Sequence, residues 1–186
     1  MQFACNVVRQ VPLLVRLINL GTARMRGGTP SPELSEESLV VAFAADLSPA
    51  MSERVRAVPD AGRRLVALAH DLRAAVIAPE PAQIAEQINT LIRHYGARPY
   101  LVEDVGQPFH LHFHGAGETV VESLGGEFAA ALALIVDGYS AQRLGQCRAK
   151  NCDAVYVDTT RNGSRRYCST SCTARATTAA YRSRRT

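Results

Sequence analysis

The feature that most restricts the fold of this chain is a set of four cysteines, arranged as two close pairs within its last 40 residues. One pair encloses four residues, the other encloses three, and 15 residues separate the pairs. This spacing is typical of a tetrahedral zinc site, because each short loop can place two thiolates on one ion. We therefore expect one structural Zn²⁺, since four thiolates leave no coordination position for water or substrate. The expected ligands are Cys147, Cys152, Cys168 and Cys172.

Two disulfide bonds are the alternative for these cysteines. They would require an oxidising compartment, and the segment Met1 to Val8 lacks the basic and then apolar pattern of a secretion signal. Zinc is therefore the favoured interpretation. A segment this short has almost no core, so the metal is expected to supply most of its folding free energy.

The residues around the two pairs predict a strand, a turn and a helix. Ala154–Val157 is rich in β-formers, and Asn162–Gly163 is a preferred two-residue hairpin turn. We expect Arg165–Tyr167 to return antiparallel to the first run. Ser169 is suited to cap a final helix with Cys172 in its first turn. This order predicts a treble-clef-like finger, with a plain zinc ribbon as the alternative.

The formal net charge of +4 is divided unevenly along the chain. From Ala141 onward the sequence contains ten basic residues and only two acidic ones, Asp153 and Asp158, which gives a formal charge of +8. The first 140 residues therefore carry a formal charge of −4. A cationic module points to a polyanion partner, and nucleic acid is the default candidate. Two or three arginines would suffice to offset the formal charge of a Zn(Cys)₄ centre, so most are expected to face solvent or a ligand.

A helix over residues 170–185 would sort its side chains by face, since each residue turns the helix by about 100°. One face would carry Cys172, Ala176, Ala179 and Ser183, small side chains suited to packing against the finger. The adjacent face would carry Arg175, Arg182 and Arg185. Double-stranded DNA is the expected partner of this face, through contacts to phosphates and to one or two guanine edges. The predicted nucleic-acid contacts are Arg161, Arg165, Arg166, Arg175, Arg182 and Arg185.

Residues 1–140 predict a mostly helical domain. Apolar residues recur at helical spacing in Leu13–Ile18, Leu39–Leu47, Leu65–Val76, Ile84–Tyr95 and Glu118–Val136. Gly27–Pro32 is expected to be a loop, and Tyr100–Val105 and Phe109–His114 predict a hairpin around Gly106–Pro108. The fold class is therefore α+β: a helical domain with a small antiparallel sheet over residues 1–140, then a zinc finger over residues 141–186. No apolar run approaches the roughly 20 residues of a membrane span, so we expect a soluble cytoplasmic protein.

Three histidines alternate along the second predicted strand. His110, His112 and His114 would project from one face of the strand, with Leu111 and Phe113 on the other. Imidazoles at this spacing could bind a transition metal or an anionic ligand. The favoured alternative is a partly exposed polar face, because the strand contains no carboxylate to complete a site.

The sequence contains no catalytic motif. A nucleophile elbow, a Walker loop, a dinucleotide fingerprint and an HExxH helix are all missing from it. We therefore expect a protein that is not an enzyme.

The run Cys147 to Arg175 closely resembles the CGNR zinc-finger family of bacteria, particularly in Val155–Ser169. The tetrapeptide that names the family is here Cys172-Thr173-Ala174-Arg175, so the metal ligand and the arginine are retained and the asparagine is not. Proteins of that family carry an N-terminal ABATE domain, described as a stress-induced transcription regulator, and Leu14–Asn19 and His110–His114 are similar to parts of it. The resemblance implies a DNA-binding transcription regulator. The charge difference between the two parts of the chain motivates a further hypothesis, that the N-terminal domain senses a signal or mediates assembly, for example into a homodimer.

Two other functions remain open. A protein-interaction adaptor would dock the basic finger onto an acidic partner. RNA binding is disfavoured by the lack of interleaved aromatic residues that stack on single strands, since the finger offers only Tyr156, Tyr167 and Tyr181. The salt dependence of DNA affinity distinguishes DNA binding from the adaptor.

Overall fold

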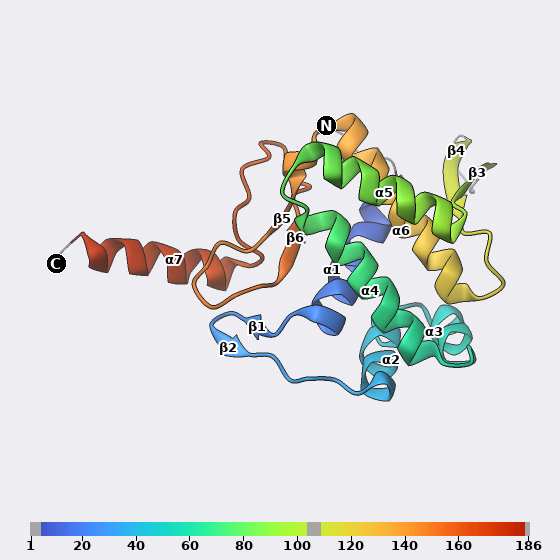
Figure 1. Ribbon diagram of the computed structural model, residues 1–186, viewed down its shortest axis with the longest axis horizontal. Helices are drawn as coiled ribbons and strands as arrows, with labels where there is room; N and C mark the ends of the chain where they lie inside the picture. Colours follow the sequence, from blue (N-terminus) through green and yellow to red (C-terminus); the bar gives the residue numbers. More distant parts are fainter. Residues whose placement is uncertain (1–4, 104–108, 185–186) are drawn as a thin grey trace.

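The computed structural model describes residues 5–103 and 109–184, with side chains from residue 9 onward. It is an α+β structure in which helices form the body and three small antiparallel sheets lie at its margins (Figure 1). The helices of the body are α1 Cys5–Thr22, α2 Glu36–Ala44, α3 Pro49–Arg56, α4 Ala61–Ile77, α5 Pro81–Tyr95 and α6 Val120–Gly138. The sheets pair β1 Met25–Arg26 with β2 Thr29–Pro30, β3 Arg98–Val102 with β4 His110–His114, and β5 Leu144–Gln146 with β6 Val155–Val157. A 3₁₀ turn, η1 Ala141–Arg143, precedes β5, and α7 Thr170–Ser183 follows the sheets. The predicted fold class is confirmed.

Helix α1 is the centre of the body and packs against α2, α4 and α6. Its apolar residues Leu14, Leu17 and Ile18 recur at helical spacing and are fully buried. Phe43 from α2 and Phe128 from α6 complete the same core. The predicted helical segments are therefore all present, because their apolar periodicity matches the face that each helix buries.

Two local structures were not expected from the sequence. Pro49, which follows the predicted helical segment Leu39–Leu47, begins a further helix, α3, whose N-terminus is capped by the Ser48 hydroxyl. Proline fits the first turn because its missing N–H has no partner there. The predicted loop over Gly27–Pro32 contains the turn and the second strand of the β1–β2 hairpin. Gly27 and Gly28 both adopt positive φ angles, 60° and 94°, as a tight two-residue hairpin turn requires.

The predicted hairpin in the middle of the chain is confirmed as an antiparallel pair. Arg98 lies opposite His114, and Val102 lies opposite His110. Its expected turn at residues 106–108 lies outside the described residues. Figure 1 shows this hairpin and α7 at opposite ends of the molecule.

The hairpin predicted inside the finger is wrong. Strand β6 pairs with β5, which precedes the first cysteine pair, so that Leu144 lies opposite Val157. Arg165–Tyr167 forms no strand. The turn of the hairpin is the segment containing Cys147 and Cys152, while Asn162–Gly163, with Gly163 at a φ of 61°, turns an irregular loop instead.

The finger and the body share one hydrophobic core. Leu144, Val155 and Val157 belong to the same buried cluster as α1, α4 and α6. Helix α7 is the exception, because Cys172 is its one buried residue within the described chain. The division into domains at residue 141 stays a prediction. Within the described residues no helix has both the length and the apolar character that crossing a membrane requires.

Candidate metal centre

The four predicted cysteines lie together in the structure, and their sulfur atoms are all within 4.8 Å of one another. Three of the sulfur–sulfur distances, Cys152–Cys168, Cys168–Cys172 and Cys172–Cys152, are 3.7, 3.7 and 3.8 Å. A tetrahedral zinc ion with Zn–S bonds of about 2.3 Å has sulfur–sulfur edges of about 3.8 Å. All four are free cysteines, and a disulfide bond would require sulfurs about 2.0 Å apart. The cluster therefore fits one structural zinc ion.

The first pair is placed by the tight turn between β5 and β6. The Cys147 N–H donates to the Ala154 carbonyl at 2.8 Å, which closes the turn. Asn151 adopts a left-handed φ of 56°, a conformation that asparagine tolerates better than most residues. Both sulfurs thereby point to the same side of the hairpin.

The second pair is placed by the start of α7. Ser169 caps the helix and accepts the Cys172 N–H at 3.2 Å, as the sequence predicted. The Cys168 N–H donates to the Cys147 sulfur at 3.4 Å, which joins the two pairs. Cys172 is fully buried and Cys168 is partly exposed.

The loop before Cys168 is held by Asp158, which is 1% exposed. Its carboxylate accepts the Thr160 N–H and the Arg165 N–H, at 2.9 and 2.7 Å. Burial alone would raise the pKa of Asp158, but the hydrogen bond that the Thr160 hydroxyl donates at 2.6 Å, the two backbone hydrogen bonds and the charge of Arg143 lower it below its ordinary value. Arg143 is itself buried and donates to the Asp158 carbonyl at 3.3 Å.

The β1–β2 hairpin covers the first cysteine pair, a contact that sequence reasoning missed. The Asp153 carboxylate accepts the backbone N–H groups of Arg24 and Met25 at 3.1 and 3.0 Å. The Gly28 N–H donates to the Asn151 carbonyl at 3.1 Å, and Ala23 packs in the cluster of the cysteines. The glycine pair signalled a turn, but no local pattern signalled its partner more than 120 residues away.

Burial raises the pKa of the Cys147 and Cys168 thiols. The pKa of Cys172 falls to about 7, because hydrogen bonds from Ser169 and the neighbouring cysteines outweigh its burial. Four sulfurs at this separation are costly to ionise together without a cation between them. The donor set and its surroundings therefore suit a metal ion that holds all four as thiolates.

The predicted nucleic-acid contacts form two groups: arginines that are exposed to solvent, and arginines whose guanidinium groups donate to backbone carbonyls of the finger. Arg161, Arg166 and Arg182 are exposed to solvent. Arg165 donates to the carbonyls of Tyr167 and Cys168 at 2.9 and 2.6 Å. Arg175 donates to the Lys150 carbonyl at 2.8 Å and lies 4.0 Å from the Cys172 sulfur. Arg185 lies outside the described residues.

The three predicted histidines lie on β4, far from the cysteines (Figure 1). The Nε2 atoms of His110 and His112 are 3.0 Å apart. His114 contacts the Tyr100 hydroxyl and pairs through Nδ1 with Glu127 of α6 at 3.2 Å. Within residues 9–103 and 109–184, whose side chains the structure describes, the cysteine cluster is the one group of three or more His, Cys, Asp or Glu side chains placed to hold a metal ion.

A buried Cys₄ cluster, shared between a tight hairpin and a helix start, defines a zinc finger. Residues 143–185 match the family model of the CGNR zinc finger. No curated protein matches the sequence. In the tetrapeptide Cys172–Arg175 the arginine retained from the family pattern binds the Lys150 carbonyl, whereas Ala174 is exposed and offers no side-chain hydrogen bond.

Proposed function

We propose that this protein is a transcription regulator whose zinc finger binds double-stranded DNA. The observation that carries the proposal is helix α7, which projects from the body (Figure 1) and carries the exposed side chain of Arg182. A helix of 14 residues is marginal in water unless it packs against something. Beyond its first turn α7 packs against little: Ala179 and Ser183, expected to pack against the finger, are exposed.

The charge around α7 supports a polyanionic partner. From Thr159 to Thr186 the sequence contains seven arginines and no acidic residue. Arg161 and Arg166, on the loop before the helix, and Arg182, two turns beyond Arg175 on the same helix face, are exposed. An exposed cationic helix has the dimensions to enter the major groove while neighbouring arginines hold phosphates.

We divide the predicted contacts by role. The Arg165 and Arg175 guanidinium groups already donate to carbonyls of the finger, so part of their hydrogen-bonding capacity is used within the protein. We therefore assign the principal DNA contacts to Arg161, Arg166 and Arg182. Arg165 and Arg175 add positive charge and hold the finger in shape.

The remaining parts of the proposal rest on the resemblance and on the cysteines. Residues 1–140 are assigned to an ABATE-like domain that senses a signal or mediates assembly. Four reduced cysteines fit the cytoplasm, where thiols stay reduced. The proposal gives the chain no catalytic role.

The test is the affinity for duplex DNA as a function of salt concentration. Counterion release predicts a linear fall of log K with log salt, by about 0.9 for each phosphate contact. Arg182→Gln and Arg161→Gln should each lower the slope by about one. Arg63→Gln is the matched control, because it removes the same charge from an exposed position of α4.

The outcomes separate the candidate functions. Steep salt dependence that Arg182→Gln reduces and Arg63→Gln does not would support DNA binding. DNA binding that is absent or insensitive to salt would contradict it and favour an adaptor that docks on an acidic protein. Tighter binding to single-stranded RNA of equal length would instead favour an RNA partner.

A further inference from the structure

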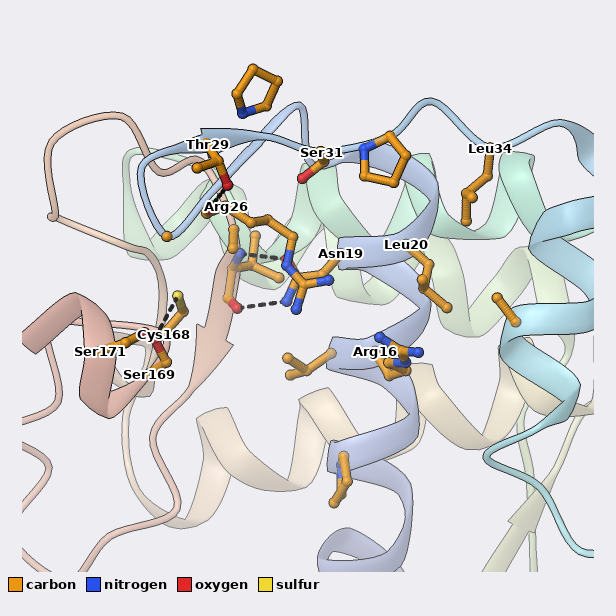
Figure 2. A pocket seen from close by; sticks show the side chains of 18 residues that line it. Arg16, Asn19, Leu20, Arg26, Thr29, Ser31, Leu34, Cys168, Ser169 and Ser171 are labelled. Carbon is orange, nitrogen blue, oxygen red and sulfur yellow. Dashed lines mark hydrogen bonds between the residues drawn. The ribbon is translucent and has the colours of Figure 1, made fainter.

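A cavity of about 720 Å³ lies between the body and the finger, in the range of small-molecule sites. Figure 2 shows α1 behind it, the β1–β2 hairpin across its top, and β6 with the start of α7 at one side. Its walls thus come from two parts of the chain that are far apart in the sequence, residues 12–42 and residues 154–171. The second cysteine pair contributes directly, through Cys168, Ser169 and Ser171.

The charged groups of the cavity are both basic. Among its described lining residues no side chain is a carboxylate, whereas Arg16 and Arg26 both line it. Arg16 is already neutralised, because its Nε lies 2.8 Å from the Asp46 carboxylate. The side chain of Arg26 extends from the hairpin toward α1 (Figure 2), and within the described residues its guanidinium makes no ion pair. The cavity therefore presents one uncompensated positive charge.

The rest of the lining is mainly apolar. Side chains of α1, the hairpin and its exit, α2 and β6 form this part of the wall; examples are Val15, Leu20, Pro30, Leu34, Ala42 and Val155. The uncharged polar residues of the lining are Asn19, Thr29, Ser31, Ser169 and Ser171. Of these, Ser31 has a buried hydroxyl with no hydrogen-bond partner among the described residues. A buried hydroxyl without a partner is costly, and a ligand carboxylate can accept a hydrogen bond from it.

We propose that this cavity binds a small organic anion with an apolar body, such as an aliphatic or aromatic carboxylate. The anionic group pairs with Arg26 and accepts a hydrogen bond from Ser31, while the apolar body contacts α1, α2 and the Cys168–Ser171 segment of the lining. This assignment goes beyond DNA binding and does not depend on it.

Because the cavity lies between the body and the finger, ligand binding affects the stability of the finger. A ligand that contacts both α1 and Cys168–Ser171 binds only the form in which the finger is docked on the body. By linkage such a ligand stabilises that form. Ligand binding is therefore expected to slow the loss of zinc from the cysteines.

The first experiment uses the zinc-loaded full chain and two fluorescent probes of similar shape. Anilinonaphthalene sulfonate carries an anionic group, and N-phenylnaphthylamine does not. Saturable binding of the sulfonate is expected, weakened at least tenfold by Arg26→Gln because a charge-assisted hydrogen bond is lost. Binding of the neutral probe should not change in the same variant. Decanoate should displace the sulfonate at concentrations at which decanol does not.

Two further variants make the result specific. Arg24→Gln removes the same charge just before the hairpin, at an exposed residue that does not line the cavity, and should bind the sulfonate normally. Ala42→Phe fills the cavity from α2 and should abolish binding of both probes. Zinc content and far-UV circular dichroism establish that each variant is folded. Sulfonate binding that is unaffected by both Arg26→Gln and Ala42→Phe, or that never saturates, would overturn the proposal.

The second experiment measures the transfer of zinc to an excess of chelator. Decanoate should slow this transfer severalfold in the wild-type protein and leave it unchanged in Ala42→Phe, with decanol as the control. Equal transfer rates with and without decanoate in a protein shown to bind the probe would refute the coupling to the finger. Because neither experiment contains nucleic acid, their failure is distinct from a failure of the protein to bind DNA.

Discussion

Asn19 of α1 holds the finger through both hydrogen-bonding groups of one residue, Val155. The Asn19 amide accepts the Val155 N–H at 2.7 Å and donates to the Val155 carbonyl at 3.0 Å. The two residues are 136 positions apart, and Asn19 is buried. Since β5 pairs with the other edge of β6, the side chain of Asn19 stands where a third strand would lie.

Replacing Asn19 should loosen the finger. Asn19→Ala leaves a buried N–H and a buried carbonyl of β6 without partners, each at a cost of about 1–3 kcal/mol. We expect a loss of roughly 2–5 kcal/mol in the free energy of unfolding, measured by urea denaturation, and faster transfer of zinc to a chelator. Asn89→Ala, at an exposed position of α5, is the control. Wild-type stability in Asn19→Ala would show that water replaces the amide without cost.

The contrast between Ser169 and Asn19 shows which features the sequence could predict. The Ser169 cap and the four zinc ligands follow from spacing within short segments, and the helices of the body follow from apolar periodicity. The strand that pairs with β6 does not follow from the sequence, because Leu144–Gln146 and Arg165–Tyr167 are both of a length that suits pairing with it. The pairing with β5 is determined by the turn that carries Cys147 and Cys152 and by the hydrogen bonds of Asn19 to Val155, a residue distant in the sequence.

Replacement by lysine should affect zinc retention and stability at Arg165 but not at Arg182. Arg165 directs two nitrogen atoms at two carbonyls, and its guanidinium lies 5.6 Å from the centre of the Tyr156 ring. Lysine keeps the charge but cannot reproduce this planar fork. Arg165→Lys is therefore expected to speed zinc loss and to cost about 1–3 kcal/mol of stability, whereas Arg182→Lys leaves both unchanged. Equal behaviour of the two variants in zinc transfer would mean that Arg165 has no structural role.

Gly28 should tolerate no side chain. Its φ of 94° is unfavourable for other residues, and a Cβ atom would overlap the guanidinium of Arg175. Gly28→Ala is expected to displace Arg175 from the Lys150 carbonyl and to destabilise the protein by roughly 1–3 kcal/mol. Gly138→Ala, whose Cβ would meet no atom within 4 Å, is the control in the same thermal denaturation. A smaller effect at Gly28 than at Gly138 would contradict the contact.

Glu122 should make the stability of the body depend on pH. It accepts the Thr119 N–H at 3.0 Å at the start of α6, and Arg64 at 2.9 Å. The hydrogen bond from Thr119, and then the charge of Arg64, lower the pKa of Glu122 below its ordinary value of 4.5. Folding therefore favours the charged carboxylate, so its contribution is complete above pH 4.5 and declines as the pH falls through the lowered value.

Glu122→Gln tests this dependence. The variant should be less stable than the wild type by about 1 kcal/mol at pH 7, and the difference should shrink in more acidic solution. Glu86→Gln, at an exposed position of α5, should match the wild type throughout. A difference between Glu122→Gln and wild type that grows with acidity would reverse the expected sign.

Removing zinc tests how far the finger and the body are separate units. Cys168→Ser, or a chelator, should unfold α7 and the loop before it, because apart from the metal the helix is held to the protein mainly by buried Cys172 and by the hydrogen bond from Arg175 to the Lys150 carbonyl. Val155 and Val157 would then leave the shared core, and each buried valine contributes about 1.5–3 kcal/mol. The body should therefore keep its helical circular dichroism but melt at a lower temperature, with faster amide exchange in α1 and α4. An unchanged melting temperature would show that β6 stays docked without metal, and loss of all helical signal would show that the body has no stability of its own.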